Sequence, residues 1–150
     1  MRHELHTTID IDAPPADVWA VLTDLDGYAG WNPFIVSAQG RVQVGERLEN
    51  RLSPPGGKAM TFKPTVTVVE EAVCFEWLGR LVMPGVFDGR HRFELIANGD
   101  GGTTLVHSEQ LSGFLVRPLR AKLDSQTKEG FVAMNEALKS TVESARCVTT

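Results

Sequence analysis

The amino-acid sequence predicts an α+β domain in which a curved sheet of about seven antiparallel strands wraps around a long C-terminal helix. Short segments with strand composition recur along the chain, and turn-forming residues separate most of them. Two short helical segments follow the first strand, and apolar residues at helical spacing run through the last part of the chain. A single helix cannot cover a flat seven-stranded sheet. The sheet is therefore expected to curve around the helix and to leave a volume between them.

Length and composition favour one globular domain. The chain has 150 residues, of which 42% are hydrophobic and 23% charged, so disorder is excluded. The formal net charge is −4 and no basic block is present, which argues against a nucleic-acid partner. We expect one domain over residues 1–146, a tail over 147–150, and a monomer or homodimer.

Two cysteines, Cys74 and Cys147, form no metal-ligand pattern and are expected as free thiols, as in a reducing cytoplasm. The first residues lead directly into an alternating segment without the apolar core of a signal peptide. No apolar run is long enough to span a bilayer. We expect a cytoplasmic protein with no stable membrane insertion and no cofactor.

The first strand is expected over residues 5–12, where Leu5, Thr7, Ile9 and Ile11 share one face. Two prolines then end it, because proline donates no ladder hydrogen bond. Apolar residues at helical spacing predict a short helix to about Leu22. A second short helix is expected over 24–30, before Pro33 breaks the pattern.

Six further strands are expected over residues 35–39, 47–52, 59–69, 73–79, 87–97 and 103–113. Their short connections imply an antiparallel meander. The loops 53–58, 80–86 and 112–115 should gather where the first strand meets Pro14, either as the mouth of a pocket or as plain turns. The long helix is expected from about Leu115 to Ala145.

Alternation predicts which side chains face inward. The inward face of the 87–97 strand carries Phe87, Gly89, His91, Phe93 and Leu95, and that of the next strand carries Leu105, His107, Glu109 and Leu111. A turn centred on Asp100 places Phe93 opposite His107 and His91 opposite Glu109. On the 59–69 strand, the inward face is expected to carry Met60, Phe62, Pro64, Val66 and Val68.

The candidate catalytic residues are His91, His107 and Glu109. Burying an unpaired charge is costly, so these groups should hydrogen-bond each other, a water or a ligand. Three interpretations are open. The residues are a hydrogen-bonded pair in the core, or they orient a ligand or act as an acid–base group, or the predicted register is wrong. Two histidines and a carboxylate can also bind a metal, but we expect none because such residues meet by chance on adjacent strands.

The remaining inward positions are apolar and predict a ligand cavity. Gly130 in the middle of the long helix leaves room for a ligand or for close contact with the sheet. The candidate ligand-binding residues are Trp31, Phe34, Met60, Phe62, Phe75, Trp77, His91, Phe93, His107, Glu109, Leu119, Leu123, Gly130 and Met134.

Several motifs resemble one known superfamily. They are the segment 11–24, Tyr28, the Trp31-Asn32-Pro33-Phe34 motif, the segment 88–93 and the segment 134–139. These resemble the polyketide cyclase/dehydrase-like SRPBCC superfamily, which includes START domains and birch-pollen-type allergens. The resemblance covers nearly the whole chain. It implies the helix-grip fold. It does not determine the function, because the superfamily includes carriers, sensors and cyclases.

Residues and resemblance together predict a protein that binds a hydrophobic small molecule, such as a lipid, quinone or aromatic polyketide-like molecule. The ligand would lie in a cavity between the sheet and the C-terminal helix, in a non-enzymatic binding or carrier protein. The alternative is a polyketide cyclase/dehydratase-type enzyme that uses the His/Glu cluster in the same cavity. A third possibility is an interaction domain with a vestigial pocket.

Overall fold

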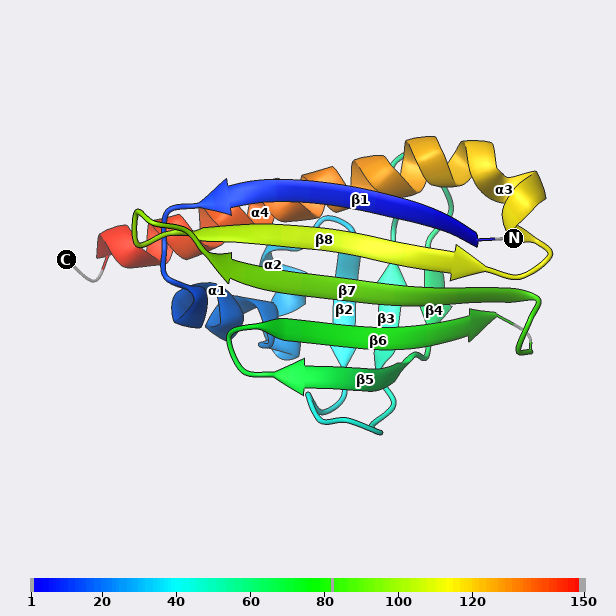
Figure 1. The fold of residues 1–150 in the computed structure, drawn as a ribbon, viewed down its shortest axis with the longest axis horizontal. Coiled ribbons are helices and arrows are strands. Elements are labelled where there is room, and N and C mark those ends of the chain that lie inside the picture. Colours follow the sequence, from blue (N-terminus) through cyan, green and yellow to red (C-terminus); the bar gives the residue numbers. More distant parts are fainter. Residues whose placement is uncertain (1, 82, 149–150) are drawn as a thin grey trace.

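The computed structural model describes residues 2–81 and 83–148 and contains two antiparallel sheets (Figure 1). The larger sheet has the strand order β1 (Arg2–Ile11), β8 (Thr103–Ser112), β7 (Phe87–Ala97), β6 (Cys74–Leu81) and β5 (Thr65–Glu70). The smaller sheet has the order β2 (Ile35–Gln39), β3 (Glu49–Leu52) and β4 (Met60–Phe62). In Figure 1 the strands of the smaller sheet cross behind the larger one.

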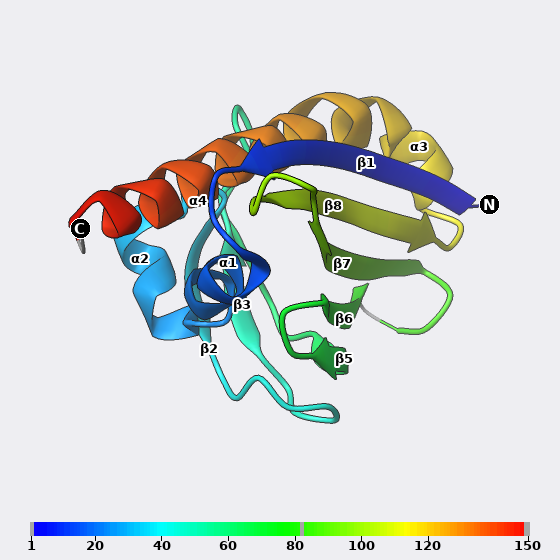
Figure 2. The same cartoon turned by 60° about the vertical axis from the view of Figure 1, so that its left-hand side comes forward.

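Helices connect and cover these sheets. Between β1 and β2 lie α1 (Pro15–Leu22), the 3-10 turn η1 (Leu25–Gly27) and α2 (Tyr28–Trp31). After β8 the chain forms α3 (Val116–Lys122), the π-helical turn η2 (Leu123–Thr127) and α4 (Lys128–Val148). Figure 2 shows α4 running along β1 and past α1. The expected fold class, a curved antiparallel sheet on a long C-terminal helix, is confirmed.

The segment expected as one strand over 59–69 is two strands in different sheets. The chain pairs with β3 up to Phe62 and with β6 from Thr65 onwards. Pro64 lies between the two strands, and proline cannot donate a ladder hydrogen bond. Residues 2–81 and 83–148 therefore form eight strands instead of the expected seven, and the break at Pro64 lets the chain pass from one sheet to the other.

The expected inward orientation of Val68 is wrong, because β5 contains a bulge. Val66 is paired with Trp77, whereas Val68 is paired with Glu76, so the register shifts at Thr67. Glu76 lies on the outer face of the sheet, and Val68 therefore faces outward rather than inward. The Thr67 hydroxyl donates a hydrogen bond of 2.8 Å to Glu76 Oε2. A one-residue bulge reverses the alternation that follows it.

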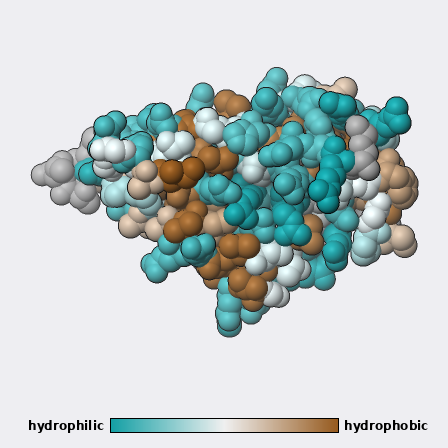
Figure 3. Space-filling model, in the orientation of Figure 1, coloured by the Kyte–Doolittle hydropathy of each residue, from teal (hydrophilic) through white to brown (hydrophobic). Residues whose placement is uncertain are grey.

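Charged side chains cover the outer face of the larger sheet, where hydrophilic side chains gather in Figure 3. Arg90 and Arg92 donate hydrogen bonds of 3.0 and 3.1 Å to the two oxygens of Glu76. Burial raises the pKa of Glu76, but hydrogen bonds from Thr67, Arg92 and Arg90 outweigh it and lower that pKa. On this face Arg90 and Arg92 therefore both form ion pairs with Glu76.

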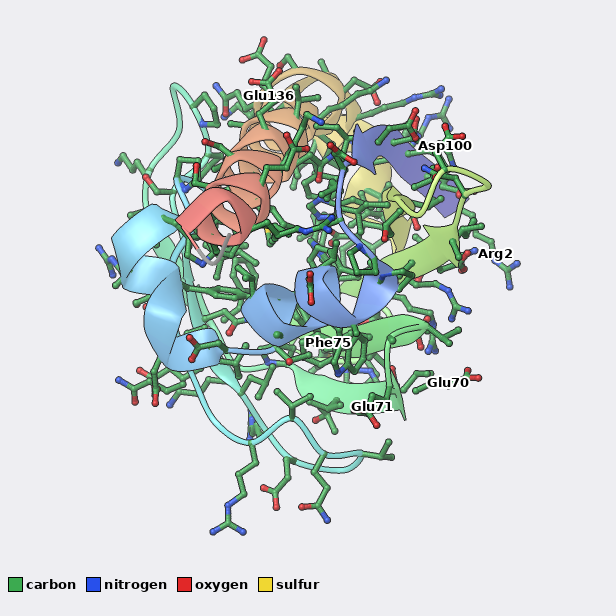
Figure 4. The ribbon with its side chains drawn as sticks, turned by 90° about the vertical axis from the view of Figure 1, so that its left-hand side faces the viewer. Arg2, Glu70, Glu71, Phe75, Asp100 and Glu136 are labelled. Atoms are coloured by element: carbon green, nitrogen blue, oxygen red, sulfur yellow. The ribbon has the colours of Figure 1, made fainter. Side chains whose placement is uncertain are left out.

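The core lies between the sheets and the helices. Trp19 and Leu22 anchor α1 in it, as their spacing predicts, and Trp19 meets the ring of Phe75 edge-on. Figure 4 places Phe75 behind α1 in the interior, whereas Glu136 points outward from α4. Cys74 is a free, buried thiol whose pKa is raised by burial. The side chain of Cys147 lies outside the described residues.

Gly130 allows close packing between α4 and Phe34, the residue that precedes β2. A Cβ atom at Gly130 would overlap the ring of Phe34, so that ring occupies the room which the glycine leaves. Gly130→Ala should therefore destabilise the protein by about 1–3 kcal/mol through overpacking, although alanine is the better helix former. Urea unfolding measures this difference in the free energy of unfolding.

Gly30 in α2 supplies the matched control. A Cβ there meets no atom within 4 Å, so Gly30→Ala should be neutral or stabilising by up to about 1 kcal/mol. Equal effects at the two glycines would contradict the packing argument.

Candidate functional site

A large cavity of about 620 Å³ lies between the larger sheet, the smaller sheet and the α3–η2 segment. Its lining is largely apolar, with lysine and glutamine side chains contributed by the 54–58 loop and the helical segment. The lining residues are Phe34, Leu52, Pro54, Gly56, Gly57, Lys58, Met60, Phe62, Phe87, Glu109, Leu111, Leu119, Lys122, Leu123, Gln126 and Thr127.

Two of the three loops expected to gather, 80–86 and 112–115, meet, but they do so at the opposite end of the first strand. The N–H groups of Phe114 and Leu115 donate hydrogen bonds to the carbonyls of Gly85 and Val86. Arg2 at the start of β1 is paired with Ser112, whereas Pro14 follows the far end of β1. The expected location beside Pro14 is therefore wrong, because β1 runs antiparallel to β8. Val82 in this region lies outside the described residues.

A smaller chamber of about 60 Å³ adjoins the large cavity. Glu109, Leu52, Phe62 and Phe87 line both spaces, so they form the boundary between them. The other lining residues of the chamber are Asn50, Pro64, Trp77, Gly79, Gly89 and His91. Glu109 therefore faces both the small chamber and the large cavity.

The predicted register of β7 and β8 is confirmed. His91 is paired with Glu109, and Phe93 with His107. His91 Nδ1 lies 3.2 Å from Glu109 Oε2, and His91 Nε2 lies 2.7 Å from His107 Nε2. The three candidate catalytic residues therefore form one hydrogen-bonded chain that begins at the boundary of the chamber and ends in the core.

Two further residues continue this chain, and the sequence reasoning missed both. His107 Nδ1 lies 2.7 Å from Asn135 Oδ1, and Asn135 Nδ2 donates a 2.9 Å hydrogen bond to Thr7 Oγ1. A signal for Asn135 existed, because it lies four residues after Phe131 on the buried face of α4. Thr7 lies on the predicted inward face of its strand, and its hydroxyl group among apolar neighbours is the signal for a polar contact there.

Burial keeps His107 uncharged. The side chain is fully buried, and desolvation together with the charge of a protonated His91 lowers the pKa of His107 well below its usual value, against the hydrogen bond to Asn135. His107 therefore belongs to the supporting part of the chain, and His91 and Glu109 belong to the part that reaches the chamber.

Aromatic rings enclose the two histidines. Phe131 stacks on His107 with ring centroids 4.1 Å apart and planes 10° apart. Trp77 stacks on His91 at 4.8 Å and 20°. These contacts restrict the imidazole rings and shield them from water, so hydrogen bonds within the chain are stronger than they would be in water.

The predicted ligand-binding residues divide into two groups. Those that line a cavity are Phe34, Met60, Phe62, Trp77, His91, Glu109, Leu119 and Leu123. Those that line neither cavity are Trp31, Phe75, Phe93, His107, Gly130 and Met134. Most members of the second group are fully buried, whereas Trp31 is half-buried and packs on Tyr28.

Asn50 is a lining residue that the sequence reasoning did not select. Its side chain is 2% exposed, and its Oδ1 atom has no hydrogen-bond partner in the described part of the chain. Nothing in the local pattern marks it, because Asn50 comes from β3 and faces the chamber only when the two sheets are assembled.

Residues 2–81 and 83–148, which the structure describes, contain neither a metal-holding group of side chains nor a membrane-spanning helix. No group of three or more histidine, cysteine, aspartate or glutamate side chains in this part of the chain is arranged to hold a metal ion. No helix formed by these residues is both long and apolar enough to cross a membrane.

Solved structures with the same fold include proteins of several kinds. The Zhui aromatase/cyclase from Streptomyces sp. R1128 has a TM-score of 0.78 and 18% identity, over 95% of this chain and 94% of its own. Norcoclaurine synthase from Thalictrum flavum has a TM-score of 0.76 and 13% identity, over 97% of each chain. Protein MLL2253 from Mesorhizobium loti has a TM-score of 0.71 and 22% identity, over 94% of this chain and 97% of its own.

No curated protein matches the chain by sequence. A family model does match, over residues 2–143, and its description is polyketide cyclase / dehydrase and lipid transport. This match covers nearly the whole chain and agrees with the curved sheet and the long C-terminal helix. The chain belongs to the polyketide cyclase / dehydrase and lipid transport family.

Proposed function

We propose that the protein binds an apolar small molecule in the large cavity and acts as a binding or carrier protein. The observation that carries this proposal is the cavity of about 620 Å³ with its largely apolar lining. Ligand pockets of drug-sized molecules commonly have volumes of about 300–1,000 Å³ and few polar groups. A lipid, a quinone or an aromatic polyketide-like molecule fits this description.

The polar groups of the cavity would orient such a ligand. Lys58, Lys122 and Gln126 belong to the exposed or half-buried parts of the lining, whereas Glu109 lies at the inner boundary. An apolar molecule would therefore lie with its body against Leu111, and with any polar group at the Glu109 end.

A second candidate function is catalysis of the cyclase or dehydratase type. The observation that favours it is the chain from Glu109 through His91 to His107, because a carboxyl group backed by an imidazole is a suitable acid–base pair. Glu109 would exchange the proton with the ligand, and His91 would support it. In that case Glu109→Gln would keep ligand binding and lose turnover.

Cavity filling tests the binding proposal. Leu119 lines the cavity, so Leu119→Trp should reduce the affinity for an environment-sensitive apolar dye at least about tenfold, by removing the space that the ligand needs. Dye fluorescence titration measures the affinity, and native mass spectrometry with extraction identifies any molecule that co-purifies.

Val132→Trp is the matched control, because Val132 is exposed on α4 and does not line the cavity. It should leave dye affinity unchanged. Equal affinity in the wild type and in a folded Leu119→Trp variant would place the dye elsewhere and refute the proposal.

A further inference from the structure

We propose that the small chamber is a hydroxyl-binding subsite, which takes the O–H group of a ligand whose apolar body lies in the large cavity. The inference rests on the proposed binding function and adds the chemical class of the ligand. It follows from the direction of the buried hydrogen bonds and from two acceptors that line the chamber.

The buried end of the hydrogen-bonded chain determines which atom donates in each of its hydrogen bonds. The Thr7 hydroxyl donates to the carbonyl of His107 at 2.9 Å, so its single proton is used there. Thr7 Oγ1 must therefore accept from the Asn135 amide nitrogen, which turns Asn135 Oδ1 towards His107. An amide oxygen accepts only, and His107 Nδ1 consequently carries a proton.

The remaining bonds follow in order. Because His107 is neutral and carries its proton on Nδ1, its Nε2 atom is an acceptor. His91 Nε2 must then donate the 2.7 Å hydrogen bond between the two rings. The contact between His91 Nδ1 and Glu109 Oε2 contains one proton, on either the imidazole or the carboxyl group. In both cases the pair has no net charge.

The carboxyl group at the end of this chain retains an acceptor for the ligand. Glu109 Oε2 faces His91, whereas Oε1 lies over the backbone of Gly89, where a Cβ atom would overlap it. No hydrogen bond from the described residues reaches Oε1. The glycine thus gives the carboxyl group a place at the boundary of the chamber, with one oxygen held by His91 and the other left for a ligand.

Asn50 supplies a second acceptor from the opposite sheet. Its side chain lines the chamber and is almost fully buried, and its Oδ1 atom has no partner among the described residues. A buried acceptor without a donor is costly, so a ligand that donates a hydrogen bond relieves this cost. Glu109 Oε1 and Asn50 Oδ1 therefore both favour a donor.

This arrangement distinguishes three classes of ligand group. A hydroxyl group donates to either acceptor, whereas an ether of the same shape cannot donate. A carboxylate adds further acceptors and a charge beside Glu109 and Asn50. The chamber of about 60 Å³ has room for a small polar group and not for a bulky one. We therefore assign it to a hydroxyl group, of an alcohol or a phenol.

The test compares two fluorescent probes that differ in one hydrogen-bond donor, 2-naphthol and 2-methoxynaphthalene. Fluorescence titration of the wild-type protein at pH 7 should give at least about tenfold tighter binding of 2-naphthol. Asn50→Leu and Glu109→Leu should each reduce this ratio to below about threefold. The affinity for 2-methoxynaphthalene should change less than about threefold in both variants.

Two matched controls accompany these variants. Glu109→Gln can donate from its amide to His91 Nδ1 and keeps an acceptor for the ligand, so the preference for 2-naphthol should persist. Gln110→Leu removes an exposed polar group of β8 that lines neither the chamber nor the large cavity, and it should also leave the ratio unchanged. Circular dichroism verifies that each variant is folded.

The possible outcomes separate the two proposals. Equal affinities of the wild type for the two probes would overturn the hydroxyl subsite and leave the binding function intact. A preference that survives in folded Asn50→Leu and Glu109→Leu would overturn it as well. Failure of both probes to bind the wild type would refute the binding function itself. The comparison on the wild type needs no variant, so a variant that fails to fold leaves the test decisive.

Discussion

Replacing Phe131 with alanine should destabilise the protein by about 3–5 kcal/mol, the range measured for large-to-small changes of buried aromatic residues. Phe131 is fully buried at the centre of the site. Its ring meets Phe34 edge-on at 5.5 Å and stacks on His107 at 4.1 Å, and it lies 5.0 Å from the ring of His91. The substitution would remove the contact that holds α4 on the histidine pair and would leave a cavity.

Urea unfolding followed by circular dichroism measures this difference in the free energy of unfolding. Val132→Ala is the control, because Val132 is the next residue of α4 and 43% of it is exposed. It should change the stability by less than about 0.5 kcal/mol. A loss below about 1 kcal/mol for Phe131→Ala would mean that α4 does not depend on its contact with the histidines.

The pairing of His91 with Glu109 could be predicted from the sequence because it depends on local information. Alternation assigns both side chains to the inward face, and the glycine-rich turn over 98–102 sets the register of two strands that are adjacent in sequence. The structure matches this register along the whole length of β7 and β8. A hairpin is the kind of structure in which turn length alone fixes which residues meet.

The division of the sheet could not be predicted in the same way. The 59–69 segment reads as one strand because its residue types suit a strand throughout. The change from one sheet to the other at Pro64 depends on which partner strand is available on each side. The bulge at Thr67 likewise depends on Glu76, which receives the hydroxyl on the neighbouring strand. Such choices are made by tertiary contacts, which override local propensity.

The deeper part of the site depends on how the C-terminal helix is rotated against the sheet. Asn135 reaches His107 only because α4 presents this face to β1 and β8. Gly130 lies on the predicted inward stripe, but the identity of its neighbour, Phe34, depends on the position of the smaller sheet. The sequence thus indicated that Gly130 faces inward but not what it contacts, and it did not indicate the position of Asn135.

The second large effect is a loss of stability at acidic pH. Between about pH 6.5 and 5 the free energy of unfolding should fall with decreasing pH, with a slope that approaches about 1.4 kcal/mol per pH unit for the proton of His107. Burial lowers the pKa of His107 in the folded protein, and a protonated His91 lowers it further. The unfolded chain therefore takes up this proton more readily than the folded protein does.

The direction of the effect follows from that difference. The stability contributed by neutral His107 is fully present above the unfolded histidine pKa of about 6.5, and it is lost as the pH falls from there towards the lower folded value. The stability contributed by ionised Glu76 is lost in a different pH range. Burial raises its pKa but hydrogen bonds from Thr67, Arg92 and Arg90 outweigh it, so that contribution disappears only below the unfolded carboxyl value of about 4.3.

Urea unfolding at a series of pH values tests the prediction, with His107→Gln as the comparison. Glutamine keeps a hydrogen-bonding side chain between His91 and Asn135 but has no titrating ring. The variant should be less stable than the wild type at pH 7.5 and should show a smaller slope between pH 6.5 and 5. If the variant does not fold, nitrogen NMR of the wild type replaces it. The ring of His107 should then keep a protonated Nδ1 and an unprotonated Nε2 at pH 6, and a doubly protonated ring at that pH would contradict both the neutral state of His107 and the direction of the hydrogen-bonded chain.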